Sequence, residues 1–380
     1  MERRRLESLG IDTSLMGYGC MRFPLNLDGT INESEAEQLL DQAIAGGVTY
    51  IDTAYPYHEQ ASEPFVGRVL NKYPRDSYTL ATKMPLWAIE TLEDAKRIFA
   101  HQLERLDKDY VDFYLFHAVN RESFEKIKTL NLVAYMEELK ETGKIRYIGF
   151  SFHDDYEVYE ELIHYYKWDF CQIQLNYMDT QMQAGLKGYE LATSLNIPVV
   201  IMEPVKGGSL ANFSDEINEM FQQVCPNMSI ASWAIRYVAG LPNVKVILSG
   251  MSTKEQVADN LATCSPFVPL SEQETDVIGK VVKTLSARIQ NGCTGCSYCM
   301  PCPVGVNIPK NFELWNTYHI YKSFSPIDYD WNNNLDDSSK AKSCVECGKC
   351  ETVCPQQIPI REDLKKLQIE LEEANKKKMR

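Results

Sequence analysis

The chain has 380 residues, of which 44% are hydrophobic and 24% charged, and its formal net charge is −14. This composition is typical of a folded globular protein, and the length predicts one large domain followed by a smaller one. The acidic balance disfavours nucleic acid and anionic membranes as partners. The sequence contains no apolar run near the roughly 20 residues of a membrane span and no recognisable signal peptide, so we expect a cytoplasmic protein.

Short apolar runs alternate with amphipathic stretches eight times before residue 270. The runs are rich in β-branched and aromatic residues, and the stretches between them carry apolar residues three and four positions apart, as helices do. Strands joined by crossover helices run parallel, and eight such units close a barrel. We therefore predict an α/β fold, a (β/α)8 TIM barrel over residues 1–270, with an open doubly wound sheet as the alternative. The predicted strands are SLMGYGC, VTYIDTA, YTLATKM, VDFYLFH, IRYIGFS, FCQIQLNY, IPVVIMEP and VKVILSG.

Four ionisable side chains follow successive predicted strands, at the end of the barrel where active sites are assembled. Asp52 and Tyr57 come after the second strand, Lys83 after the third and His117 at the end of the fourth. Each alone would more often form a salt bridge or a cap. Together they suit reduction of a carbonyl group: Lys83 could stabilise a tyrosinate, Asp52 could hold the ammonium, and an imidazole could orient the carbonyl oxygen.

The segments YIDTAYPY, ATKMP, VDFYLFH and GKIRYIGFS resemble, in this order, four well-known segments of the aldo-keto reductase family. The leading RRRLESLG is similar to the hairpin that closes the bottom of those barrels. The resemblance implies that Tyr57 is the general acid, that Asp52 and Lys83 tune it, and that His117 positions the carbonyl of a small-molecule substrate. It also implies that NAD(P)H delivers a hydride.

Several cofactor positions depart from the pattern of that family. Phe152 follows Ser151 where an asparagine is usual, and Met202 stands where a tyrosine commonly stacks on the nicotinamide. Gly250 and Gln256 replace Lys and Arg residues that often bind the 2′-phosphate of NADPH; the loss of cationic donors leaves NADH and NADPH equally open. The cofactor-binding residues that the resemblance implies are Ser151, Gln174, Met202, Gly250, Lys254, Gln256 and Asn260.

Eight cysteines fall in two short runs in the last part of the chain. The second run reads C-x2-C-x2-C-x3-C-P, the spacing of bacterial ferredoxins, and the first differs only in a shorter last spacing. Zinc also accepts paired cysteines, but triplets that end in Cys-Pro favour two [4Fe-4S] clusters. Disulfides are not expected in a reducing compartment. The predicted metal ligands are Cys293, Cys296, Cys299, Cys302, Cys344, Cys347, Cys350 and Cys354.

The proline-flanked cysteine that ends each run should ligate the cluster of the other run. Cys354 would then complete the first cluster and Cys302 the second. The long link between the runs resembles the helical dicluster modules of succinate dehydrogenase iron–sulfur subunits more than compact ferredoxins. We therefore predict a connecting helix over residues 271–290 and a small, mainly helical, dicluster ferredoxin-like domain over residues 291–380.

The two kinds of cofactor differ in the number of electrons that they transfer. A nicotinamide transfers a pair as hydride and an iron–sulfur cluster transfers one at a time, so exchange between them requires a flavin or a radical. The main prediction is an NAD(P)H-dependent carbonyl reductase with two accessory 4Fe-4S clusters. The alternative is an electron-transfer oxidoreductase whose clusters exchange single electrons with FMN or a substrate at the barrel mouth, with a redox partner protein as a further candidate.

Overall fold

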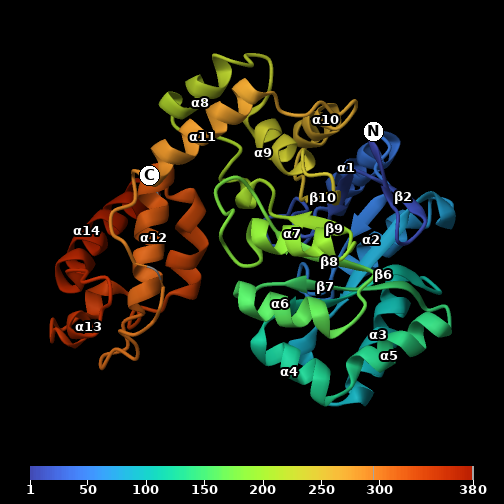
Figure 1. Cartoon of the computed structure of the whole chain (residues 1–380), viewed down its shortest axis with the longest axis horizontal. Coiled ribbons are helices and arrows are strands. Elements are labelled where there is room, and N and C mark those ends of the chain that lie inside the picture. The colour runs from blue at the N-terminus through green and yellow to red at the C-terminus, as the bar shows by residue number, and fades with distance from the viewer. Residues whose placement is uncertain (294, 379–380) are drawn as a thin grey trace. The chain divides into compact units, whose positions relative to one another are not determined.

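The computed structural model describes residues 1–293 and 295–378. Its chain forms two compact units. The first contains Met1–Lys206 and Met228–Leu270, and the second contains Gly207–Asn227 and the chain from Ser271 onward. In Figure 1 the strands of the first unit run from blue to yellow, and the helices α12 and α14 of the second unit are orange and red.

Eight parallel strands close the barrel of the first unit, in the order β10-β3-β4-β5-β6-β7-β8-β9. Each strand pairs with its neighbours along the chain, and the first closes on the last through pairs such as Met16 with Ile247. The predicted TIM barrel is therefore confirmed, and the open sheet was the wrong alternative. The strands are β3 (Met16–Gly19), β4 (Tyr50–Asp52), β5 (Thr79–Met84), β6 (Val111–Val119), β7 (Ile145–Phe152), β8 (Phe170–Gln174), β9 (Val199–Met202) and β10 (Val244–Ser249).

An antiparallel hairpin precedes the barrel, formed by β1 (Arg3–Leu6) and β2 (Ile11–Ser14). Leu6 is fully buried and packs with inward-facing side chains of the barrel, among them Tyr50, Phe113 and Val246. The hairpin thus contributes an apolar side chain to the core inside the barrel. The polar side chains described below lie at the opposite, carboxyl ends of the strands.

Amphipathic helices surround the strands (Figure 1). The third is representative: its buried residues recur three and four positions apart, and a capping box between Thr91 and Asp94 fixes its start. These helices are α1 (Glu33–Ala45), α2 (Ser62–Leu70), α3 (Leu92–Leu106), α4 (Arg121–Thr129), α5 (Leu132–Glu141), α6 (Tyr156–Tyr165), α7 (Gly185–Ser194), α9 (Ile230–Ala239) and α10 (Lys254–Thr263).

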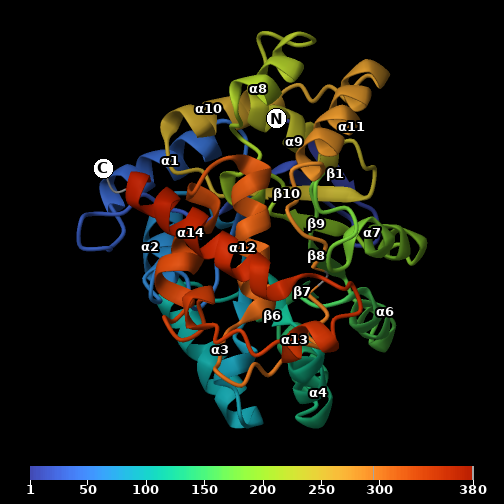
Figure 2. The same cartoon turned by 90° about the vertical axis from the view of Figure 1, so that its left-hand side faces the viewer.

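The second unit is mainly helical, and its core lies between α12 and α14, which pack side by side (Figure 2). Trp315 of α12 and Leu367 of α14 are among its buried residues. Residues 207–227 belong to this unit and supply a helix that contacts α11. None of the helices in the described part of the chain is long and apolar enough to cross a membrane. The helices of this unit are α8 (Asp215–Gln222), α11 (Glu272–Ser286), α12 (Ile308–Tyr321), α13 (Lys349–Thr352) and α14 (Ile360–Lys378).

Candidate active site and cysteine cavities

Lys83 is the centre of a buried polar group at the carboxyl end of the barrel. Its Nζ donates to Asp52 Oδ1 at 2.6 Å and to the carbonyl oxygen of Thr53 at 2.8 Å, and it lies 3.4 Å from the hydroxyl oxygen of Tyr57. The side chains of Lys83 and Asp52 are 0% and 3% exposed. Since β4 and β5 are paired in parallel, their carboxyl ends bring these side chains together. Three of the four predicted catalytic residues are thus in contact.

His117, the fourth, lies near the end of β6. Its ring is 6.1 Å from the ring of Tyr57 and nearly perpendicular to it. The next residue, Ala118, has a φ of 51°, which is unusual for a residue with a side chain. The amide of Ala118 donates to Ser151 Oγ at 2.8 Å. Ser151, predicted to contact the cofactor, therefore also fixes the backbone that carries His117.

Burial sets the charges of this group more than any single neighbour. Burial lowers the pKa of Lys83, but Asp52 and Tyr57 raise it by more, so Lys83 is an ammonium. Burial raises the pKa of Tyr57 and outweighs the opposite effect of Lys83. Burial, followed by the charge of Lys83, holds the pKa of His117 well below 6.5. At neutral pH the phenol is protonated and the imidazole is neutral.

Two acceptor or donor atoms in this group point to an additional ligand. Nδ1 of His117 and Oδ2 of Asp52 are buried and have no hydrogen-bond partner among the described residues. Buried polar atoms are nearly always paired in folded proteins. The exposed neighbour Trp87 lies beside His117, with ring centroids 5.0 Å apart and the rings tilted by 55°. A polar group of a small molecule bound at the mouth could pair with the imidazole.

A second layer of buried side chains supports Lys83 from the helices. Glu63 Oε1 accepts hydrogen bonds from Thr82 Oγ1 at 2.7 Å and from Gln102 Nε2 at 2.8 Å. Gln102 Nε2 also lies 3.0 Å from the carbonyl oxygen of Lys83. These contacts tie α2 and α3 to β5, so the backbone of Lys83 is fixed on both sides. All three polar side chains are fully buried.

Gln174 and Met202 end neighbouring strands, β8 and β9, and are paired across them. Gln174 Nε2 donates to Asp179 Oδ2 at 3.1 Å, and its Oε1 accepts from Gln183 Nε2 at 3.0 Å. The sulfur of Met202 accepts a hydrogen bond from Gln172 at 3.6 Å. The structure brings both predicted cofactor residues to the barrel mouth, where other protein groups already contact them.

Gly250 follows β10 directly, and Asn260 of α10 contacts the last residue of that strand. Asn260 is 5% exposed, and its Nδ2 donates to Ser249 Oγ at 2.9 Å. Gly250 is approached closely by the side chain of Arg22, from the loop after β3. Asn260 therefore holds the last residue of β10 in place, and the next residue, Gly250, must be a glycine because the side chain of Arg22 lies against it.

Lys254 and Gln256, predicted to contact the phosphate end of the cofactor, begin α10. Lys254 Nζ donates to Gln38 Oε1 of α1 at 2.7 Å. Gln256 Oε1 accepts from the amide of Ser252 at 2.7 Å. Both side chains thus form contacts within the protein, and Lys254 would have to leave Gln38 to bind a phosphate.

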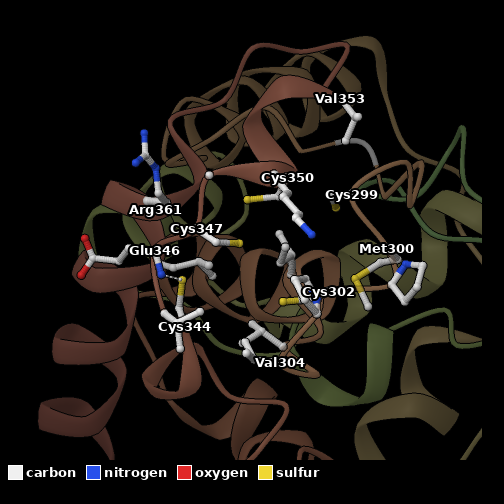
Figure 3. A pocket seen from close by; sticks show the side chains of 18 of the residues that line it. Cys299, Met300, Cys302, Val304, Cys344, Glu346, Cys347, Cys350, Val353 and Arg361 are labelled. Carbon is white, nitrogen blue, oxygen red and sulfur yellow. Dashed lines mark hydrogen bonds between the residues drawn. The ribbon is translucent and has the colours of Figure 1, made fainter.

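The eight cysteines of the two runs line two cavities of the second unit. Figure 3 shows the cavity of the second run. The thiols of Cys302, Cys344, Cys347 and Cys350 line the cavity in Figure 3, together with Cys299. Another cavity is lined by Cys293, Cys296, Cys299 and Cys354. Four thiolates around one cavity fit the ligand set of a [4Fe-4S] cluster.

The loops that carry these cysteines turn sharply between ligands. Ser297 and Glu346 adopt φ values of 60° and 57°. The amide of Glu346 donates to Cys344 Sγ at 3.4 Å, as expected for a loop that surrounds thiolates. Within the described residues, no group of three or more His, Cys, Asp or Glu side chains is arranged to hold a single ion. A cubane cluster instead takes each thiolate at a different iron atom.

Two family models match this chain in the two regions just described. The model described as "Aldo/keto reductase family" matches residues 15–283. The chain belongs to the aldo/keto reductase family. A model described as "4Fe-4S dicluster domain" matches residues 292–358. This aldo/keto reductase is therefore an oxidoreductase with a 4Fe-4S dicluster domain, as the sequence predicted.

Several known proteins are similar to this aldo/keto reductase. A probable aldo-keto reductase 1 from Glycine max is 30% identical over 155 residues, which cover 39% of this chain and 44% of that protein. The NADH-specific methylglyoxal reductase of Escherichia coli (strain K12) is 27% identical over 323 residues, covering 74% of this chain and 96% of the relative. A Klebsiella pneumoniae aldo-keto reductase solved in complex with NADPH shares the fold, with a TM-score of 0.61, 21% identity and coverage of 74% and 96%.

Two mouth residues of this aldo/keto reductase were missed by sequence reasoning. Trp87 lies in the short helix η2 (Leu86–Ala88), four positions after Lys83, and its place on the loop after a strand with a predicted catalytic residue could have indicated it. Arg22 offers no such signal, because its proximity to Gly250 joins residues at opposite ends of the barrel sequence.

Proposed function

We propose that this aldo/keto reductase reduces a carbonyl group of a small molecule with hydride from NADH or NADPH. The observation that carries the proposal is the buried Nζ of Lys83, which is within hydrogen-bond reach of both Asp52 and Tyr57. The similarity to an NADH-specific reductase and to a structure with NADPH supports a nicotinamide cofactor. The name of the Escherichia coli relative suggests methylglyoxal as a test substrate.

In this mechanism the phenol of Tyr57 gives its proton to the carbonyl oxygen. Its raised pKa keeps the proton in place at neutral pH, and the Lys83 ammonium stabilises the phenolate that remains after transfer. The neutral imidazole of His117 hydrogen-bonds the carbonyl oxygen and orients it. A bound nicotinamide supplies the hydride that the carbonyl carbon receives. Gln174 and Ser151, at neighbouring strand ends, are proposed to contact its carboxamide.

We further propose that the second unit holds two [4Fe-4S] clusters with exchanged ligands. The lining of the two cavities supports this, because Cys354 lies with the first run and Cys302 with the second. These cysteines would be thiolates in the loaded protein. The clusters would supply single-electron chemistry, which hydride transfer to the carbonyl carbon does not use, so their proposed role in the reductase is accessory.

A second candidate function is single-electron transfer, and exposure of the cysteine cavities favours it. Cys296 and Cys347 are exposed. Val345 and Val353, beside the second run, are 63% and 51% exposed. A redox partner protein could approach a cluster there. FMN or a radical substrate at the barrel mouth would then have to divide an electron pair, and flavin released by heating anaerobically purified protein would favour this candidate.

The reductase proposal is tested with Tyr57→Phe, which removes only the hydroxyl group. We expect kcat for methylglyoxal, or another carbonyl that the wild type reduces, to fall by about 10²–10⁴ because general acid catalysis is lost. Cofactor affinity should be unchanged. The matched control is Tyr55→Phe, since Tyr55 lies in the same loop with its ring beneath Arg105. Wild-type turnover by Tyr57→Phe would show that Tyr57 is not the acid.

A further inference from the structure

Arg22 crosses the end of β10, and Gly250 makes room for it. A Cβ atom added at position 250 would lie 2.8 Å from Cβ and 2.7 Å from Cγ of Arg22. These atoms form the base of the side chain, so they have little freedom to move aside. Gly250 is not among the glycines with positive φ. The requirement for glycine at this position therefore comes from the aliphatic stem of Arg22 and not from the backbone.

The charge of Arg22 acts on residues of the loops after β9 and β4. Glu203 follows β9 directly; burial raises its pKa, and Arg22 is among the charges that lower it. Burial also lowers the pKa of His58, and Arg22 lowers it further. Gly250 and Ser252 directly follow β10, so the contacts of Arg22 with these two residues place it at the barrel mouth. No hydrogen bond or ion pair of this group is found among the described residues.

The loops beside Arg22 follow the seventh and eighth strands of the barrel, β9 and β10. In (β/α)8 enzymes these are the loops that frequently bind a phosphate group. The other cation here, Lys254, donates to Gln38. The backbone of Arg22 is held in place, since its carbonyl oxygen accepts from Ser252 Oγ at 2.7 Å. Arg22 is thus a positioned cation with its donors still available.

We propose that the guanidinium group of Arg22 binds a phosphate of the nicotinamide dinucleotide, where a basic residue at position 250 is absent. The inference rests on the proposed nicotinamide-dependent function. A guanidinium group donates two parallel hydrogen bonds to a phosphate, which suits it to this contact better than a lysine. Arg22 comes from the loop after the first strand of the barrel. Few cationic donors are expected from the sequence when only the residues after the last strand are considered.

The test is a titration of the full-length, cluster-loaded protein with NADH and with NADPH, followed by quenching of tryptophan fluorescence. In Arg22→Gln we expect at least one dinucleotide to bind about tenfold or more weakly, because a charge-assisted hydrogen bond is lost. A loss for NADPH alone assigns the contact to the 2′-phosphate, and an equal loss for both assigns it to the pyrophosphate. Arg22→Lys, which keeps the charge, should lose less.

The matched control is Arg97→Gln, because Arg97 is an exposed arginine on α3 that pairs with the nearby Asp94. It should bind both dinucleotides as the wild type does. Binding of both dinucleotides by Arg22→Gln within about twofold of the wild type would overturn the inference while leaving the reductase proposal intact. A wild-type protein that bound neither dinucleotide would contradict the proposed function and the inference with it.

Discussion

The polar group at the barrel mouth and the cysteines of the second unit are supported in opposite ways. Lys83 is fully buried, and its position is fixed by hydrogen bonds to protein groups on its ammonium and on its backbone. Seven of the eight cysteines of the two runs lie outside helices, Cys350 lies in the short helix α13, and Cys296 and Cys347 are exposed. The barrel mouth is thus formed by the protein alone, whereas the cysteine loops surround cavities that a cluster would fill.

The hydrophobic cores of the two units also differ in size. The barrel unit has a large apolar cluster that extends over the eight strands of the barrel and the helices around them. The second unit has a smaller one, against which cysteines such as Cys293 and Cys350 pack. Small domains often depend on a bound metal for stability. Substitutions should therefore act on charge and catalysis in the first unit and on cluster assembly in the second.

The largest expected effect comes from breaking the buried pair at the mouth. Lys83→Met leaves Asp52 buried without its partner, so we expect the free energy of unfolding of the barrel to fall by about 3–5 kcal/mol and carbonyl reduction to be lost. The measurement is urea unfolding followed by circular dichroism, together with turnover. Lys72→Met is the control: Lys72 is 39% exposed and pairs with Glu37 and Asp41, so its loss should cost under about 1 kcal/mol. Equal losses in the two variants would contradict the view that burial makes the first pair important.

The next effect concerns which cysteines share a cluster. If the last cysteine of each run ligates the other cluster, Cys354→Ala should perturb the cluster of Cys293, and Cys302→Ala that of Cys344. Electron paramagnetic resonance of the reduced, anaerobically purified protein would resolve the two signals. The control is Cys225→Ala, which changes a cysteine outside both runs. Damage confined to the run that carries each substitution would mean two independent sites and no exchange of ligands.

The sequence predicted the barrel because its information is periodic and local. Each of the eight predicted segments coincides with one strand of the barrel, although β6 and β7 extend beyond the predicted ends to Val119 and Phe152. Asp52 and Lys83 meet because both lie at the carboxyl ends of adjacent parallel strands, which is a property of the topology and needs no detailed packing. The cysteine spacing was equally informative, since chelate spacing is a local property of the chain.

What could not be predicted depends on packing between distant segments. The stem of Arg22 fills the space beside Gly250, and no pattern in either segment indicates that contact. The support of Lys83 by Gln102 likewise joins a helix to a strand end. Sequence reasoning also considered only the effect of Lys83 on the pKa of Tyr57. Burial has the larger effect on this pKa, and the degree of burial is known only from the fold.

The smallest expected effect is a rate that barely changes with pH. In the proposed mechanism the reaction needs protonated Tyr57 and neutral His117. Burial raises the pKa of Tyr57 above 10.0, so the phenol loses its proton only in strongly alkaline solution. Burial and Lys83 lower the pKa of His117 well below 6.5, so the imidazole gains a proton only in acid. Between about pH 7 and 9 both groups keep the required protonation state, and kcat should not change with pH there.

The measurement is kcat for carbonyl reduction at saturating cofactor across this range, with His101→Asn as a control because His101 is exposed on α3. An inflection near neutral pH that persists in His101→Asn and vanishes in His117→Asn would show that the pKa of His117 is not lowered. It would contradict the view that the barrel mouth is as buried as the contacts of Lys83 indicate.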